Sequence, residues 1–166
     1  MTIRIAQLSI LASLVTCMAG GAVAQETGSF EATVALGSDA PVSLSGFCIS
    51  AEGEGGWYAQ MVTPGGDSTI MLLYAGGGPP QTGEYEIQDF VGNDAQPPEG
   101  AFIATGSTDE QRFVISGFHS VSGTLLITAS SGQGVVGTFS FSARETGGSE
   151  RSATVNGTFT SAAKDQ

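Results

Sequence analysis

The stretch GVVGTFSFSARETGGSERSATVNGTFTS, Gly134 to Ser161, contains the triplet Gly-Thr-Phe twice, at 137–139 and 157–159. Glycine is a poor strand former, whereas threonine and phenylalanine are among the best. Runs of alternating apolar and polar residues flank the segment Gly-Gly-Ser, which predicts two antiparallel strands joined by a short loop. The repeated triplet must therefore be explained by the way in which the two strands pair.

The pairing follows from the face on which each side chain lies. One face of the first strand carries Val135, Phe139, Phe141 and Ala143, and one face of the second carries Ala153, Val155 and Phe159, all with odd numbers. The numbers of two opposed residues must therefore have an even sum if these apolar faces are to coincide. With a three-residue loop at 147–149, the predicted pairs are Phe139 with Gly157, Phe159 with Gly137, Phe141 with Val155 and Glu145 with Arg151. Each phenylalanine ring should cover a glycine of the neighbouring strand.

The preceding run, 123–131, extends the same ladder. A three-residue loop at 132–134 predicts Leu125 opposite Phe141, Ile127 opposite Phe139, and Ala129 opposite Gly137. The other face of the three strands carries Ser, Thr and Asn, with Leu126 as the exception. One face is therefore predicted to be core and the other solvated, as in an antiparallel meander that forms part of a sandwich or a barrel.

The rest of the chain also indicates an all-β protein. Short runs rich in Val, Ile, Thr and Phe alternate with Gly, Pro, Asp and Ser, and no long segment has helical spacing. Strands are predicted near 30–36, 42–51, 57–63, 68–75, 84–90, 101–106, 112–118, 123–131, 134–145 and 151–161. We expect one domain over 25–166, an antiparallel β-sandwich or flattened β-barrel of about 8–10 strands. The run 68–75 is apolar on both sides and is expected to be central.

The first residues resemble an export signal. A charged Arg4, an apolar run over 5–15 and the small residues Ala22-Val23-Ala24 predict a signal peptide at 1–24 that is cleaved before Gln25. Cys17 leaves a second interpretation open, because 14–17 is similar to a lipoprotein signal in which the cysteine carries the lipid. The chain is thus expected to be periplasmic or secreted, or else lipid-anchored at the membrane through Cys17.

Charge and cysteine content limit the function classes. Sixteen acidic residues against five basic ones give a net charge of −11, which disfavours binding to nucleic acid or to an anionic membrane surface. After cleavage of 1–24 only Cys48 remains, so no internal disulfide is expected. We interpret Cys48 as a small buried apolar residue.

Few residues are candidates for a site. Asp89, Asn93, Asp94 and Glu99 could offer oxygen ligands to a metal, although their spacing matches no calcium loop and turn chemistry explains them equally well. Trp57 and Tyr58 could form a ligand platform or belong to the core. His119 is interpreted as a turn residue, and the glycine-rich segments lack the helix and lysine of a phosphate site. No catalytic residue and no cofactor is predicted.

The C-terminal segment SGTLLITASSGQGVVGTFSFSARETGGSERSATVNGTFTSA, with Gly83-Glu84-Tyr85 upstream, resembles small exported bacterial proteins, many of them classed as lipoproteins of unknown function. The resemblance covers roughly 80–165 and implies the β fold and export, but no activity. We therefore expect a non-enzymatic binding or interaction module of the cell envelope, with an envelope protein or a small ligand as partner. The alternatives are a lipocalin-like carrier of a small apolar ligand and a hydrolase that uses carboxylates such as Glu52, Glu54, Asp89 or Asp94.

Overall fold

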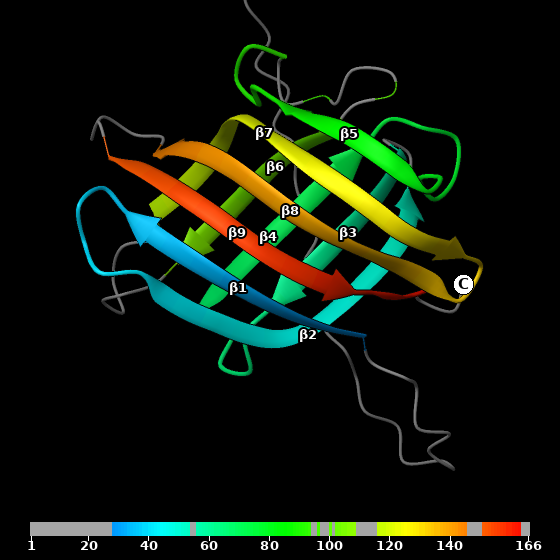
Figure 1. The fold of residues 1–166 in the computed structure, drawn as a ribbon, viewed down its shortest axis with the longest axis horizontal. Helices are drawn as coiled ribbons and strands as arrows, with labels where there is room; N and C mark the ends of the chain where they lie inside the picture. The colour runs from blue at the N-terminus through cyan, green and yellow to red at the C-terminus, as the bar shows by residue number, and fades with distance from the viewer. Residues whose placement is uncertain are drawn as a thin grey trace, which may run out of the picture.

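The structure of the chain is a computed structural model that describes residues 28–53, 56–93, 96, 100, 102–108, 116–145 and 151–163. Within these residues the secondary structure is β-strand, and Figure 1 shows how the strands follow one another. The strands are β1 (Gly28–Leu36), β2 (Val42–Gly53), β3 (Gly56–Val62), β4 (Ser68–Tyr74), β5 (Gly83–Gln88), β6 (Phe102–Thr108), β7 (Ser116–Ser131), β8 (Gly134–Glu145), β9 (Ser152–Thr160) and β10 (Ala162–Ala163). The predicted signal peptide, with Cys17, lies outside the described residues.

Eight strands form a ring of antiparallel pairs. The order is β1-β9-β8-β7-β6-β4-β3-β2, and β2 pairs back with β1 from Val42 to Cys48. The two remaining strands widen the ring at one end: β5 lies between β6 and β7, and β10 continues along β2 where β1 begins. The predicted all-β fold is confirmed, and the hydrogen-bonded ring makes it a flattened barrel.

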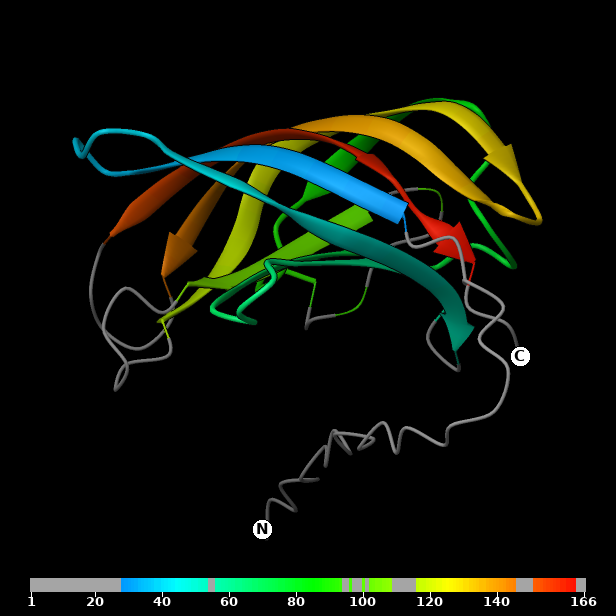
Figure 2. The same cartoon turned by 90° about the horizontal axis from the view of Figure 1, so that it is seen from below.

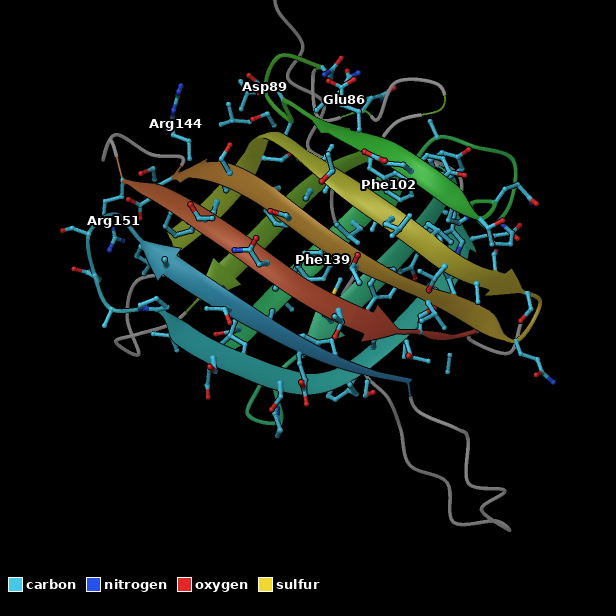
Figure 3. All side chains as sticks on the ribbon, in the orientation of Figure 1. Glu86, Asp89, Phe102, Phe139, Arg144 and Arg151 are labelled. Carbon is cyan, nitrogen blue, oxygen red and sulfur yellow. The ribbon has the colours of Figure 1, made fainter. Side chains whose placement is uncertain are left out.

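The barrel has two walls and two ends. In Figure 2, β1, β9, β8 and β7 arch over one side, and β3, β4 and β6 form the flatter side below; we call these the β8 wall and the β3 wall. The strand β2 runs from beside β1 down to the β3 wall, which its second half joins. The Trp57 end is where β2 turns into β3 and β7 into β8. The Arg151 end is where β3 turns into β4 and β8 leads to β9, and Figure 3 places Arg144 and Arg151 there.

The register of β8 and β9 is as predicted. Phe139 is opposite Gly157, Phe159 is opposite Gly137, and both rings are buried. The predicted ion pair closes the hairpin: Arg151 Nε donates to Glu145 Oε2 at 2.9 Å and Nη2 donates to Oε1 at 2.7 Å. The even-sum rule was sufficient here because no register shift interrupts the pairing of β8 with β9.

The predicted register of β7 against β8 is wrong by two residues. Leu125 is opposite Phe139 and Ile127 is opposite Gly137, and the loop has two residues, Gly132 and Gln133. A two-residue loop alone would turn the apolar side chains of β7 away from the core. The register shifts by one residue between Ile127 and Ala129, and this shift returns Leu125 and Ile127 to the core face. A second shift, between Ser120 and Ser122, keeps 116–131 in one strand where two strands were predicted.

One core fills the ring. It is formed by the inward-facing residues of all the long strands, among them Phe30, Met61, Leu72, Phe102, Leu125 and Phe139. As predicted, Cys48 is a buried member of this core, with no exposed surface. The outward residues of β7, β8 and β9 are mainly the Ser, Thr and Asn that the sequence placed on the solvated face, and Leu126 is 45% exposed among them.

Ser120 holds the junction of β5, β6 and β7, a role that sequence reasoning missed. Its buried hydroxyl donates to the carbonyl of Gln88 at 2.7 Å and accepts from the backbone N–H of Ala104 at 2.9 Å. These groups lie where β5 and β6 separate from one another, so neither can complete a regular ladder there. The hydroxyl replaces the missing strand partner.

We expect Ser120→Ala to lower the free energy of unfolding by about 1–3 kcal/mol, because it leaves the Ala104 N–H and the Gln88 carbonyl without their partner in the core. Ser122→Ala is the matched control: its hydroxyl is exposed, and the change should cost less than about 0.5 kcal/mol. Chemical denaturation of both variants measures the difference. Equal losses would contradict the role of Ser120.

Candidate functional site

Trp57 and Tyr58 lie on opposite faces of β3. Trp57 is 3% exposed and packs edge-on against Phe102, with 6.2 Å between the ring centres. Tyr58 points outward from the β3 wall and is half-buried. The two side chains therefore do not form a shared platform, and only Tyr58 lies on an outer surface.

An aromatic cluster closes the Trp57 end from within. Phe102, labelled in Figure 3, stacks on Tyr74 at 4.8 Å and meets Tyr85 edge-on at 5.2 Å. The Tyr85 hydroxyl donates to the Gln81 carbonyl at 2.8 Å, and burial beside Tyr74 raises its pKa. Outside this cluster lies an open groove of about 280 Å³, lined by polar and apolar groups that include Glu52, Pro79 and Ser131.

The Arg151 end holds a small apolar cavity of about 30 Å³, lined by Leu36, Ile70, Phe118, Phe141 and Val155 among others. A water molecule needs about 10–15 Å³ on this measure, so the space corresponds to about two waters. A lipocalin-like carrier needs an interior that can enclose a whole ligand. In the part of the barrel that the structure describes, side chains occupy that space.

The outer surface of the β3 wall differs from that of the β8 wall. Over β2 to Ala51, β3 and β4, the sequence contains no Asp, Glu, Lys, Arg or His. The inward residues of these strands are core residues, so the alternate residues face outward. We define the apolar face by these outward residues: Phe47, Ile49 and Ala51 of β2, Tyr58, Gln60 and Val62 of β3, and Thr69, Met71 and Leu73 of β4.

The residues of the apolar face form regular rows across the strands. Ala51, Tyr58 and Leu73 make one row, and Ile49, Gln60 and Met71 make the next. In the third row Phe47, which is 40% exposed, is opposite Val62. With about 4.8 Å between strands and 3.3 Å per residue, the face covers about 300 Å². Apolar patches of this size on a monomer often have a function, whereas single exposed apolar residues are common.

The proposed metal ligands serve a turn where they are described. Asp89 Oδ1 accepts from the backbone N–H groups of Val91 at 2.9 Å and Gly92 at 3.0 Å. The Asn93 amide donates to the Asp89 carbonyl at 2.8 Å. Asp94 and Glu99 lie outside the described residues, and among the described ones no three His, Cys, Asp or Glu side chains gather into a metal site.

The hydrolase candidates are similarly dispersed. Glu52 is exposed at the Trp57 end, on β2, whereas Asp89 follows β5. Glu54 lies outside the described residues, as does Asp94. His119, interpreted from the sequence as a turn residue, instead lies in β7, edge-on to Phe90 at 4.2 Å between ring centres. Partial burial lowers its pKa, against the opposing effect of Asp89.

Cys48 is held in an unreactive form. Burial raises the pKa of its thiol to about 12, and the thiolate is the species that reacts with electrophiles. A nucleophilic cysteine would need the opposite shift. Cys48 thus belongs to the core of the barrel and not to a site.

We expect Cys48 to react with a thiol reagent at pH 8 at least about 10³-fold more slowly in the folded protein than in the denatured protein, from the difference in thiolate fraction. A form of the chain that starts at Gln25 has this cysteine as its single thiol. Reaction with a chromogenic disulfide, with and without guanidinium, measures the ratio. Comparable rates would place Cys48 at the surface.

Comparison with known proteins was negative throughout: no family model, no curated protein and no solved structure matches the chain. The resemblance to small exported bacterial proteins therefore stays a prediction. The described residues include no helix long and apolar enough to cross a membrane.

Proposed function

We propose that the protein is an exported, non-enzymatic binding module of the bacterial cell envelope, and that it binds a protein partner through the apolar face of the β3 wall. The observation that carries this proposal is the contrast between the two walls. Outward positions of β7, β8 and β9 carry mainly Ser, Thr and Asn, with Leu126 as an exception, as expected for a solvated sheet. In the apolar face seven of the nine outward positions are apolar, and Gln60 and Thr69 are the other two.

The contrast cannot be attributed to strand propensity alone. Thr and Ser form most of the solvated face of the β8 wall, and strand propensity alone would allow the same residue types on the outer face of the β3 wall. Met71, Leu73 and Tyr58 instead leave apolar surface in contact with water, at about 25 cal/mol for each Å² exposed. Covering this surface with a partner recovers that free energy, which is the usual reason for a contiguous apolar patch.

A sheet face is broad and shallow, which suits a polypeptide better than a small molecule that needs a concave site. The face covers about 300 Å², whereas a stable protein–protein interface buries about 800 Å² on each partner. The face can therefore be the apolar centre of a larger interface or the whole binding site of one short polypeptide segment.

Export is supported by the sequence of residues 1–24. We expect the protein isolated from its own cells to begin at Gln25, as determined by intact-mass measurement and N-terminal sequencing. A diacylated N-terminus at Cys17 would support the lipid-anchored alternative instead. A protein that retains Met1 and remains in the cytoplasm would overturn the envelope assignment.

The docking proposal is tested by placing a photo-crosslinking residue at Leu73, on the apolar face, or at Thr138, on the β8 wall, in cells that express the full chain. We expect one discrete crosslinked product from position 73 that disappears when Met71→Ser is added, and none from position 138. Equal products from both positions, or products that Met71→Ser does not affect, would contradict the proposal. Turnover of glycan or ester substrates that Glu52→Gln abolishes would contradict its non-enzymatic part.

A further inference from the structure

The open end of the barrel near Trp57 has a concave surface that the docking proposal does not use. One hollow, the open groove of about 280 Å³ outside the aromatic cluster, lies between the end of β2, Pro79 and the turn between β7 and β8. A second open hollow, of about 800 Å³, is lined by 75–79 and by Gly53 and Gly56. Both hollows are lined by Glu52 and Pro79, so they adjoin one another, and we call them together the Glu52 groove.

Glu52 belongs to the inward side of β2. It shares this side with Cys48 and Ser50, and it is opposite the buried Trp57 of β3. The barrel ends at this level, so Glu52, which follows the core residues of β2, is exposed at the rim. Its Oε1 atom lies 3.7 Å from the position that a Cβ atom would take at Gly78, in the connection between β4 and β5. The carboxylate thus lies where the two hollows meet.

The acidic group of the groove is uncompensated. Glu52 is the single ionisable side chain among the described residues that line either hollow. Within the described part of the chain, its carboxylate has neither a hydrogen-bond donor nor an ion-pair partner. Figure 3 shows Arg144 and Arg151 at the other end of the barrel. An unpaired carboxylate in a concave site, in a chain whose net charge is −11, attracts cations and repels anions.

A buried hydroxyl beside Glu52 has a hydrogen bond to donate. Ser50 lines the same groove and is 3% exposed. Its Oγ accepts from Ser161 Oγ at 2.9 Å, and Ser161 is also 3.2 Å from the carbonyl of Val135. The described residues provide no acceptor for the hydrogen of Ser50 itself. Buried polar groups normally complete their hydrogen bonds, so this hydroxyl is suited to an acceptor atom of a ligand.

We propose that the Glu52 groove binds a small organic cation that also carries a hydrogen-bond acceptor. The ammonium group pairs with the Glu52 carboxylate, and an acceptor such as a hydroxyl oxygen receives the hydrogen of Ser50. The two residues are two apart on one strand, so their α-carbons are about 6.6 Å from one another. A short carbon chain that joins the two groups of the ligand packs against Pro79 and Ala163. The concave shape favours a small molecule, in contrast to the broad apolar face.

The experiment compares linear probes that share one carbon chain and differ in their end groups. Aminohexanol has an ammonium and a hydroxyl group, hexanediol has no charge, hydroxyhexanoate is an anion, and hexylamine lacks the acceptor. NMR titration of the isotope-labelled full chain at low salt gives each affinity and the amides that respond. We expect aminohexanol to bind about fivefold more tightly than hexanediol, and hydroxyhexanoate to bind least. The shifts should gather around the groove, at Gly77 and Gly132 among others.

Two variants separate the charge of the groove from its hydrogen bond. Glu52→Gln should abolish the preference for aminohexanol over hexanediol, and high salt should reduce it. Glu31→Gln, the matched loss of an exposed carboxylate on β1, should change the preference by less than about twofold. Ser50→Ala should weaken aminohexanol and hexanediol about threefold and leave hexylamine within about twofold. Thermal melting verifies that each variant is folded.

The chain itself offers one competing cation. Lys164 directly follows Ala163, which lines the groove, and it lies outside the described residues. We expect Lys164→Gln to leave the affinity for aminohexanol within about twofold. A rise of about tenfold or more would mean that this lysine occupies the carboxylate of Glu52, and an external cation would then be the wrong ligand.

Three further results would overturn the cation site. The first is a lack of saturable binding by both amines, and the second is equal affinity of aminohexanol and hexanediol for the unmodified chain. The third is a preference that Glu52→Gln leaves unchanged, because the amine would then be held by other carboxylates. Shifts that gather on the apolar face and disappear with Met71→Ser would likewise place the probe outside the groove. None of these results bears on the docking proposal, which the crosslinks from Leu73 test separately.

Discussion

Phe139→Ala should lower the free energy of unfolding by about 3–5 kcal/mol, the usual cost of removing a buried aromatic ring together with the cavity that it leaves. Phe139 is 3% exposed, and its ring lies within 6.3 Å of the Phe159 ring and 6.0 Å of the Phe141 ring, measured between centres. The ring also covers the backbone of Gly157, which the substitution would expose. A loss of this size is a large part of the total stability of a small domain.

The control for Phe139→Ala is the adjacent residue. Thr138 points outward from the β8 wall and is exposed, so Thr138→Ala should cost less than about 0.5 kcal/mol. Denaturant melts give the free energy of unfolding of both variants. The two substituted residues are adjacent in the sequence and lie on opposite faces of β8. A loss for Thr138→Ala as large as that for Phe139→Ala would contradict the assignment of Phe139 to the core face and of Thr138 to the solvated face of β8.

Gly157→Ala should cost about 1–3 kcal/mol or more, although it adds a single methyl group. A Cβ atom at Gly157 would lie 2.5 Å from Cζ of Phe139, 2.7 Å from the carbonyl oxygen of Glu31 and 2.9 Å from Cβ of Ala32. The ring could move, but the backbone of β1 could move only by disturbing its pairing with β9. Gly132→Ala, in the turn between β7 and β8, has no atom within 4 Å of the added Cβ and should be nearly neutral.

A double-mutant cycle shows whether the ring is the obstacle at Gly157. If Phe139 and Gly157 interact directly, the costs of Phe139→Leu and Gly157→Ala should not add, and the coupling should be about 0.5–3 kcal/mol. Additive costs would indicate that the methyl group meets the β1 backbone alone. Either result is obtained from the equilibrium unfolding of four proteins.

The sequence was informative where pairing is local. The β8–β9 register could be predicted because the two strands pair without a register shift, and one arrangement buries both apolar faces. The same reasoning failed for β7, because an irregularity after Ile127 can exchange a three-residue loop for a two-residue one without exposing the core. His119 was misplaced for a related reason: the Gly- and Ser-rich segment around it looks like a turn but continues as a strand.

The parts that depend on distant pairing could not be predicted. Nothing local to β1 indicates that it joins β2 to β9, or that β5 enters beside β6 in parallel. The sequence did show that β4 is apolar on both sides, and it was expected to be central. The structure places β4 between β3 and β6, with Met71 and Leu73 on the outside. Alternation identifies two apolar faces, but the tertiary fold decides which of them is left without a cover.

The pairing of β1 with β9 also governs when the chain can finish folding. Residues 29–36 must wait for residues 153–160 before the ring can close, although 28–34 can pair with 42–48 much earlier. A chain that emerges from a ribosome or a translocon N-terminus first therefore carries an unpaired edge on β1 until β9 has been delivered. Such late, long-range closure slows folding and prolongs exposure to aggregation. Removal of β9 would leave two permanent open edges, one on β1 and one on β8, which makes residues 152–160 a requirement for solubility.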